Sequence, residues 1–439
     1  MRRASFVLTC VVLPALFVSC SALAQMLVLA APPAMPQNHA HAAVTIPVSS
    51  LGYMPPGLLP ALNNASLVSL NFVDSNHLLF SFNIPGLVER KDGCATDTTP
   101  QWVKTVILNI NTGKVQNQVQ WNIADNTPYI YPLRDGKFLL QRCTQIDIFN
   151  DNLDLQPFLN IDGRIRFLRL SADGSNILIE SQHLDTSTSG SSGSKSKSMN
   201  LSFLRVPQLD VLTQFHVPDL ETFPMFDRGF LLAKHARRNQ WEIVFEPFSK
   251  TLGTTRVLTA VNSTCAPQLS ELTSNSFLVS VCEGEAQSTM TDQAYDLSGS
   301  KLWQQSVDQN HLSRKFGQAR NAHIVYAADL SRVAVGTLHT SHAMATENQI
   351  NASSSTLNLN TGMMEPTSPF VENGEVDGQA IRVLDTRSGQ AVFQFITTPI
   401  YSSGQNFALS PHGNRLAVLH DGAIEIYKLD HGYIAPAGR

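Results

Sequence analysis

The chain has 439 residues, a length that allows two or three average domains or one large closed β architecture. Charged residues make up only 15% of it and the formal net charge is -4, so composition gives no support for binding to nucleic acid or to an anionic membrane. No linker-like change in composition divides the body of the chain, which favours a single domain.

The N-terminus has the three parts of a secretory signal. A basic start at Arg2 and Arg3 is followed by an apolar stretch over residues 6–18 and by a small-x-small site at residues 22–24. The apolar stretch is short for a membrane span and contains Pro14. We therefore predict cleavage after residue 24 and no transmembrane segment in the mature chain.

Cys20 leaves an alternative open. Residues 16–19 before it are close to a bacterial lipoprotein signal, except that Phe17 stands where that signal has a small aliphatic residue. We predict a secreted or periplasmic protein, and a lipoprotein anchored at Cys20 is the alternative. The residues after the signal, 25–42, are rich in Ala and Pro without a period, which is typical of a flexible lead-in.

One unit of sequence recurs along the body of the chain. Its first half is an apolar strand, a tight turn rich in Asp, Asn, Ser and Gly, and a second apolar strand. Residues 167–179 and 407–418 show this pattern most clearly. Looser copies have their turns at residues 73–76, 134–136, 227–229, 273–275 and 329–331.

The second half of the unit is another strand, a turn with Gly, and a last strand. Residues 107–114, 295–299 and 383–390 show it. Four short strands recurring about every 40 to 50 residues is the spacing of propeller blades. A β-sandwich would not alternate two distinct turn types. On these residues the chain resembles the bacterial WD-repeat-like and TolB- or YVTN-like propellers, although it has no Trp-Asp dipeptide or Gly-His opening.

The resemblance covers the body of the chain and implies a fold that is shared by proteins of unrelated function. We predict an all-β protein with a single propeller of seven four-stranded blades, and six or eight blades are the alternatives. The blades fall near residues 66–123, 126–160, 164–218, 221–261, 264–308, 320–398 and 404–430.

The last of these blades has only three strands. The strand-like segment 44–48 at the other end of the body would supply the missing outermost strand and so close the ring. Pro47 is tolerated there because an outermost strand is a sheet edge. The chain then divides into a signal peptide (1–24), a lead-in (25–42), a propeller domain (43–430) and a C-terminal tail (431–439).

Four cysteines remain after removal of the signal peptide: Cys94, Cys143, Cys265 and Cys282. An even set in an exported chain indicates disulfides rather than metal ligands. Cys265 and Cys282 lie on either side of one tight turn and should face each other across an antiparallel pair. Cys94 and Cys143 then form the second bridge, on the same side of the ring.

Connections between strands differ strongly in length. Those from first to second and from third to fourth strand are short and leave the blade on one face, while the others leave on the opposite face. Three connections of the second kind are long: 83–102, 182–199 and 338–378. Because long loops on a rigid scaffold commonly carry function, we expect a ligand or partner on the face that bears them.

Two groups of residues on that face are candidate ligand contacts. Lys234, His235, Arg237 and Arg238 lie in a connection of the fourth blade and would suit an anionic group, while a solvated hairpin tip is the alternative interpretation. His339 and His342 lie in the longest connection, together with residues that would suit a soft metal ion: Met344, Glu347, Met363 and Met364. Scattered His and Met in a long loop usually pack or are solvated, so we predict no metal.

Two classes of function remain open. The first is a binding or scaffold module, expected to be a monomer, for a protein, peptide or glycan outside the cytoplasm. The second is an enzyme such as a glycosidase, a lyase or a quinoprotein-like dehydrogenase. Residues 296–303 and 385–393 are similar to the quinoprotein blade motif, but only the first contains the Trp, so we predict no cofactor. Since no pair of glycosidase carboxylates is recognisable, we favour the binding module and assign no catalytic residues.

Export predicts the start of the mature chain. N-terminal sequencing and intact mass of the exported protein should place the first residue at Gln25. A retained signal segment, or a mass that includes acyl chains on Cys20, would show that this cleavage prediction is wrong.

Overall fold

The computed structural model describes residues 41–55, 67–88, 101–123, 129–182, 199–217, 223–283, 289–307, 323–340, 376–397 and 405–429. All of them belong to one compact unit, Pro36–Arg439. Within these ranges no helix is long and apolar enough to cross a membrane. The regular structure is almost entirely antiparallel β, interrupted by two short 3-10 turns, η1 (Ser49–Leu51) and η2 (Arg134–Gly136).

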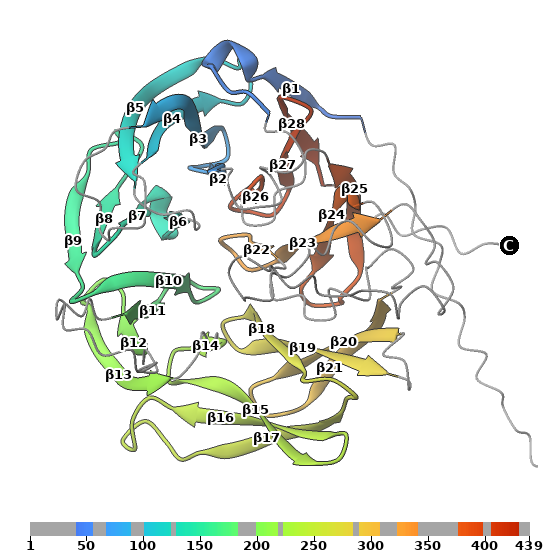
Figure 1. The fold of residues 1–439 in the computed structure, drawn as a ribbon. Helices are drawn as coiled ribbons and strands as arrows, with labels where there is room; N and C mark the ends of the chain where they lie inside the picture. The colour runs from blue at the N-terminus through green and yellow to red at the C-terminus, as the bar shows by residue number, and fades with distance from the viewer. Residues whose placement is uncertain are drawn as a thin grey trace, which may run out of the picture. The chain divides into compact units, whose positions relative to one another are not determined.

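The described strands form seven four-stranded antiparallel sheets around a common centre, which confirms the predicted seven-bladed propeller (Figure 1). Blades 1 to 3 contain β2 (Ser69–Phe72), β3 (His77–Val88), β4 (Gln101–Asn109), β5 (Val115–Ile123), β6 (Ile130–Pro132), β7 (Phe138–Arg142), β8 (Gln145–Phe149), β9 (Gln156–Asn160), β10 (Arg164–Leu170), β11 (Asn176–Gln182), β12 (Met199–Arg205) and β13 (Asp210–Val217). Blades 4 to 6 contain β14 (Met225–Phe226), β15 (Gly229–Arg237), β16 (Gln240–Pro247), β17 (Arg256–Asn262), β18 (Gln268–Thr273), β19 (Ser276–Glu283), β20 (Thr289–Asp296), β21 (Lys301–Val307), β22 (His323–Tyr326), β23 (Arg332–Thr340), β24 (Val376–Asp385) and β25 (Ala391–Thr397). In each of these blades the first strand is innermost.

Blade 7 joins the two ends of the described chain. It contains β26 (Phe407–Leu409), β27 (Arg415–His420) and β28 (Ala423–Lys428), and β1 (Val44–Pro47) pairs with β28 from Val44↔Ile426 to Pro47↔Ala423. The predicted closure by the N-terminal strand is confirmed. Pro47 lies on the outermost strand, where its missing N–H leaves no ladder partner unsatisfied.

The hydrophobic core lies between blades. In the described chain, seven clusters of buried apolar side chains each join one pair of neighbouring blades. In β11, Ile177 and Ile179 pack toward blade 2, whereas Leu178 between them packs toward blade 4. Because successive side chains of a strand point to opposite faces and both faces are covered, these strands are continuous apolar runs.

The strands next to the predicted long connections extend further than the sequence indicated, so these connections are shorter than predicted. Residues 83–88 extend β3, and β23 and β24 stay paired out to Thr340↔Val376, so the predicted loop boundaries at Asn83, Leu338 and Gly378 are wrong. Backbone hydrogen bonding continues a ladder whatever the side chains are, which is why polar residues there did not mark the end of a strand. The middle parts of these connections lie outside the described residues.

One of the two predicted disulfides is confirmed. Cys265, directly before β18, bonds to Cys282 in β19, with the two Cα atoms 5.6 Å apart. The bridge therefore ties the two innermost strands of blade 5 together. Cys94 lies outside the described residues, so its pairing with Cys143 stays a prediction.

The glycines in the turns between third and fourth strands join each blade to the one before it. Gly113, Gly299 and Gly389 all have φ between 68° and 92°. A Cβ at Gly299 would lie 2.0 Å from the carbonyl oxygen of Leu258 on the outer strand of blade 4. One at Gly389 would lie 2.5 Å from the ring of Trp303 on blade 5, whose indole N–H donates to Thr386.

Two alanine substitutions separate backbone strain from this crowding. Gly113→Ala should destabilise by about 1 kcal/mol, because a Cβ there adds left-handed strain but lies 3.5 Å from its nearest neighbour, Ile46. Gly299→Ala should cost about 2–4 kcal/mol, since backbone overlap adds to the same strain. Urea denaturation of both variants tests this, and equal losses would show that crowding against blade 4 is unimportant.

Candidate functional site

A cavity of about 1,510 Å³ follows the axis of the propeller. Its walls come from the innermost strand of six blades and, in blade 4, from residues that include Phe223 just before β14. It extends from Phe223, Ala266 and Gln405, where inner strands begin, to the turns that join first and second strands. These turns, which we call the 1–2 turns, form the charged end of the cavity.

Three aspartates of the 1–2 turns line the cavity, and each bonds to its own turn. Asp74 Oδ1 accepts hydrogen bonds from the backbone of Asn76 and His77 at 2.6 and 2.9 Å. Asp329 Oδ1 accepts from the N–H and hydroxyl of Ser331 at 2.9 and 2.6 Å. Such local bonds explain why Asp recurs in tight turns.

Asp173 also bonds to its own turn, but through only one of its two carboxylate oxygens. Its Oδ1 accepts from the hydroxyl groups of Ser171 and Ser175, both at 2.7 Å, and from the Ser175 N–H at 3.0 Å. Partial burial opposes ionisation, but these bonds and the charge of Arg134 hold the pKa of Asp173 below its usual range. No hydrogen bond from another described residue reaches Oδ2.

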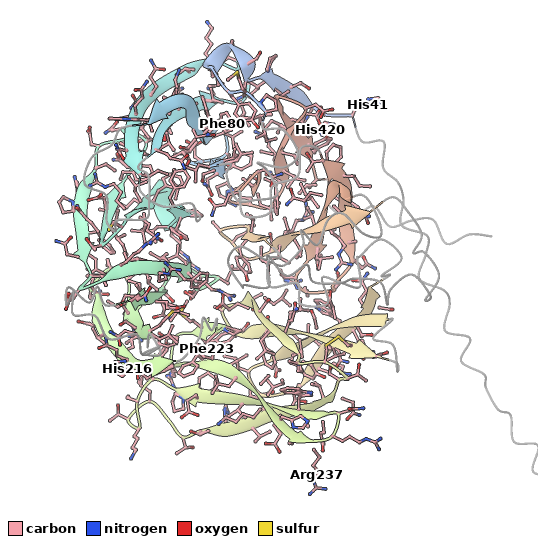
Figure 2. All side chains as sticks on the ribbon, viewed as in Figure 1. His41, Phe80, His216, Phe223, Arg237 and His420 are labelled. Atoms are coloured by element: carbon pink, nitrogen blue, oxygen red, sulfur yellow. A yellow bond between two sulfur atoms is a disulfide. The ribbon has the colours of Figure 1, made fainter. Side chains whose placement is uncertain are left out.

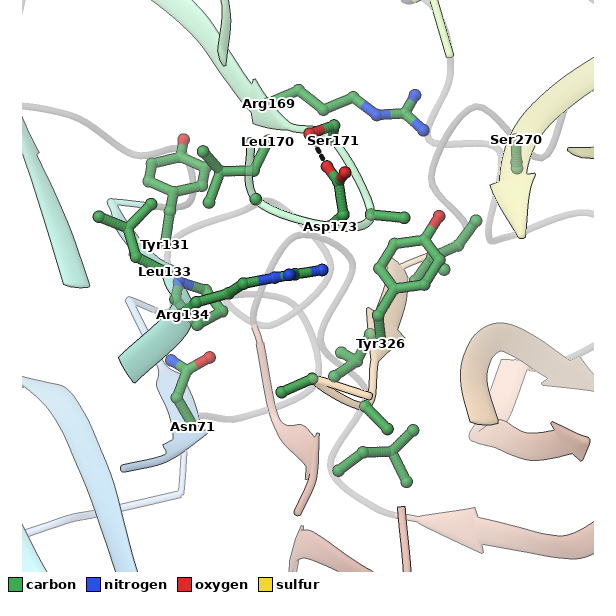
Figure 3. A pocket seen from close by; sticks show the side chains of 18 of the residues that line it. Asn71, Tyr131, Leu133, Arg134, Arg169, Leu170, Ser171, Asp173, Ser270 and Tyr326 are labelled. Atoms are coloured by element: carbon green, nitrogen blue, oxygen red, sulfur yellow. Dashed lines mark hydrogen bonds between the residues drawn. The ribbon is translucent and has the colours of Figure 1, made fainter. Parts of the chain in front are cut away.

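Arg134 supplies an available cation. It begins η2, the 1–2 turn of blade 2, and its exposed side chain reaches into the cavity toward the side where Asp173 and Tyr326 lie (Figure 3). A Cβ at Gly174 in the next blade would lie 3.9 Å from the Arg134 Cγ, so the stem runs beside that turn. The guanidinium has no hydrogen-bond or ion-pair partner among the described residues.

A second guanidinium, that of Arg169, is held in the wall by a buried carboxylate. Glu271 on β18 is completely buried, and an Arg169 nitrogen lies 3.6 Å from its Oε2. The carboxylate also accepts hydrogen bonds from two backbone N–H groups, those of Ala172 and Met225. Burial raises the pKa of Glu271, and Arg169 and the two amides act in the opposite direction.

Tyr326 completes this group of residues. Its hydroxyl donates to the backbone carbonyl of Glu271 at 3.0 Å, and it interacts electrostatically with Arg169. Arg169, Met225, Glu271 and Tyr326 come from blades 3, 4, 5 and 6, so Glu271 connects four successive blades, through its carboxylate to blades 3 and 4 and through its backbone carbonyl to blade 6. We call these four residues and Ala172 the Glu271 clasp.

The residues predicted as ligand contacts lie elsewhere. Lys234, His235 and Arg237 belong to the end of β15 and Arg238 to the turn that follows, with Arg237 on the outer edge of the molecule (Figure 2). His235 contacts its own hairpin, through the Arg238 carbonyl at 2.6 Å and the Trp241 ring at 4.9 Å. His339 is part of β23, where it pairs with Gly378, and His342 lies outside the described residues. Their role in ligand binding stays a prediction.

Sequence reasoning missed the charged residues of the cavity wall, although a signal was present. Arg169 stands in the segment 167–170, which is otherwise apolar, near the end of β10, and Glu271 stands in β18. A charged side chain in the innermost strand of a blade must be paired or face the channel, because both faces of the blade are covered by the neighbouring blades. The 1–2 turn of Arg134 was recognised only for its turn residues.

Comparison with known proteins adds no family. No protein-family model and no curated protein matches the chain. Among solved structures, the uncomplexed acylaminoacyl peptidase of Pyrococcus horikoshii is similar over 83% of this chain and 52% of that one, with 11% identity and a TM-score of 0.44. Hsv2 of Kluyvelomyces marxianus is similar over 69% and 76% of the two chains, with 10% identity and a TM-score of 0.34.

These likenesses carry no argument about function. The identities are too low to transfer an activity, and the chain spans only about half the length of the peptidase, 52%. What the chain does has to be argued from its own cavity.

The Glu271 clasp predicts a large loss of stability when its carboxylate is replaced. Glu271→Gln keeps the size but puts an NH₂ group against one of the two backbone donors and leaves Arg169 without its counter-charge. We expect a loss of about 2–4 kcal/mol in denaturant unfolding. The exposed Glu283→Gln, on the adjacent strand, is the matched control and should change little. Equal small effects would mean that the clasp does not hold the blades.

Proposed function

We propose that this chain is an exported binding module whose propeller holds a ligand in its axial cavity. The observation that carries the proposal is the guanidinium of Arg134, which has no partner among the described residues and lies in a cavity whose walls come from all seven blades. A structural arginine normally finds acceptors in its own protein, whereas this one points into open space lined by polar and aromatic groups.

The carboxylates of the cavity support binding more than catalysis. A general acid or base must exchange a proton with the substrate. Asp74 and Asp329 bond to their own turns, and Glu271 is buried and bonded to two amides, whereas Asp173 bonds to its turn through Oδ1 and presents Oδ2 to the cavity. These groups support the cavity wall, so a binding role uses the geometry as it stands.

Export is part of the proposal. The Cys265–Cys282 bridge is compatible with an oxidising compartment, as expected for a secreted or periplasmic protein. The cavity also reaches Phe223 and Gln405, which precede the inner strands β14 and β26, at the face where the second strands β3, β11 and β23 end and the long connections begin. A partner protein, peptide or glycan on the long-connection face would therefore meet the same axial space, and the predicted role of that face remains part of the proposal.

A channel-filling variant tests the proposal. The mature chain is screened by thermal shift against organic acids, amino acids, short peptides and oligosaccharides. Compounds that stabilise the wild type should lose their effect in Ser270→Phe, because Ser270 lines the cavity on β18 and a phenyl ring there occupies the space (Figure 3). Leu302→Phe, on the exposed outer strand β21, is the control and should bind normally.

Two results would count against a binding module in the channel. One is a set of hits that bind Ser270→Phe as well as wild type, which would place the ligand elsewhere. The other is chemical conversion of a bound compound, detected by mass spectrometry, which would favour the enzyme alternative.

A further inference from the structure

Arg134 and Asp173 present opposite charges to the same space without joining. They come from the 1–2 turns of neighbouring blades and influence each other electrostatically, yet they form no ion pair within 4.0 Å. Each has hydrogen-bonding capacity that no described residue uses. The Arg134 guanidinium has donors with no described acceptor, and the Asp173 Oδ2 is an acceptor with no described donor. Any group that occupies this space contacts both signs of charge.

The backbone positions of Arg134 and Asp173 are set by their turns. Gly136 and Gly174 adopt φ values of 67° and 68°, and the Gly136 Cα faces the backbone of Val73 in blade 1. Asp173 is held through Oδ1 by two serine side chains. The turns thus set where both side chains begin, and the Asp173 carboxylate is also oriented by its serine bonds.

The surrounding wall favours a small ligand with both signs of charge. A simple anion would be attracted by Arg134 and Arg169 but repelled by Asp173, and a simple cation would meet the reverse. Carboxylates suit the planar donors of a guanidinium, and an ammonium group suits a free carboxylate oxygen. Leu133, Leu170 and the ring of Tyr131 lie beside these charges and offer apolar surface to a side chain (Figure 3).

We propose that the charged end of the cavity binds a small zwitterion of the amino-acid type, with its carboxylate against Arg134 and its ammonium group against Asp173. Arg169, which the Glu271 clasp keeps in the wall, adds positive charge to the cavity. The low pKa of Asp173 keeps its carboxylate charged at neutral pH. This inference rests on the proposed function, because it names the ligand class of the same cavity.

Calorimetric titration with a dipeptide tests the ligand class. The probes are alanyl-alanine, its N-acetylated form, its C-amidated form and free alanine as a shorter zwitterion. A free zwitterion should bind, and blocking either terminus should weaken binding about tenfold or more, since each block removes one charge-assisted contact.

Substitutions in the protein should reproduce each chemical block. Arg134→Gln should weaken the free dipeptide about tenfold and leave the C-amidated form unchanged, because its carboxylate contact is already lost. Asp173→Asn, which keeps an oxygen for the turn, should weaken binding of the free dipeptide about tenfold and leave binding of the N-acetylated form unchanged, because that form has already lost its ammonium contact. Arg387→Gln removes a positive charge from an exposed 3–4 turn outside the cavity and should have no effect.

The outcomes separate this inference from the proposed function. Equal binding of N-acetylated and free dipeptide would show a simple anion site and overturn the inference. The inference would also be overturned if no zwitterion bound while another compound did bind and lost its binding in Ser270→Phe. In that case the proposed function would stand. If no compound binds in that manner, both fail. Thermal melts of Arg134→Gln and Asp173→Asn confirm that the loss is not due to unfolding.

Discussion

Closure of the ring by β1 is the constraint on which the rest of the structure depends. An open propeller would leave one face of blade 7 and one face of blade 1 without a neighbour, and their strands are apolar on both faces. β1 adds the fourth strand to blade 7, and Ile46 within it packs in the cluster that joins blade 7 to blade 1. A strand of only four residues, Val44–Pro47, thereby completes a circle of interfaces in which every blade is covered twice. The axial cavity exists only because this circle is closed.

The Glu271 clasp links that architecture to the candidate site. Apolar contacts between blades are adaptable and do not dictate where a polar side chain projects. A buried carboxylate is more demanding, because each acceptor that it offers must be matched. Glu271 meets this demand by taking N–H groups from blades 3 and 4 and a guanidinium from blade 3. The same bonds that hold the inner strands also fix Arg169 and Tyr326 in the cavity wall, so stability and site geometry have a common cause.

The fold was largely predictable because its signals are local. Turn residues such as Ser171–Gly174 and Ser410–Gly413 separate apolar strands within a few positions, and each lies between a first and a second strand as expected. Cys265 and Cys282 were paired correctly because they lie on either side of one hairpin. Even β1 was predictable, since three strands at one end require a fourth from elsewhere.

The candidate site was not predictable because its contacts are between blades. Nothing near Glu271 in the sequence indicates that its partners are Ala172 and Met225 from two other blades. The strand ends were predicted wrongly for a related reason. His339 pairs with Gly378 through backbone hydrogen bonds, and the side chains of one strand do not show where its backbone partner ends.

The separation of Arg134 from Asp173 is informative about what the charged end is for. If these groups only stabilised the fold, closing the gap to an ion pair would be favourable by up to about 1 kcal/mol in an exposed setting. The gain is small, and the turns that carry the two residues are tied to their neighbours, Gly136 against Val73 and Gly174 beside Arg134. The turn of Asp173 holds its carboxylate through Oδ1, and Arg134 lies beside it without pairing, so both charges are available to a group that fits between them. Asp173 adds little ordering cost on binding, since its turn has already oriented the carboxylate. Two opposite charges that lie side by side without pairing, and without other ion-pair partners in the described part of the chain, are better suited to recognise a ligand than to hold the blades together.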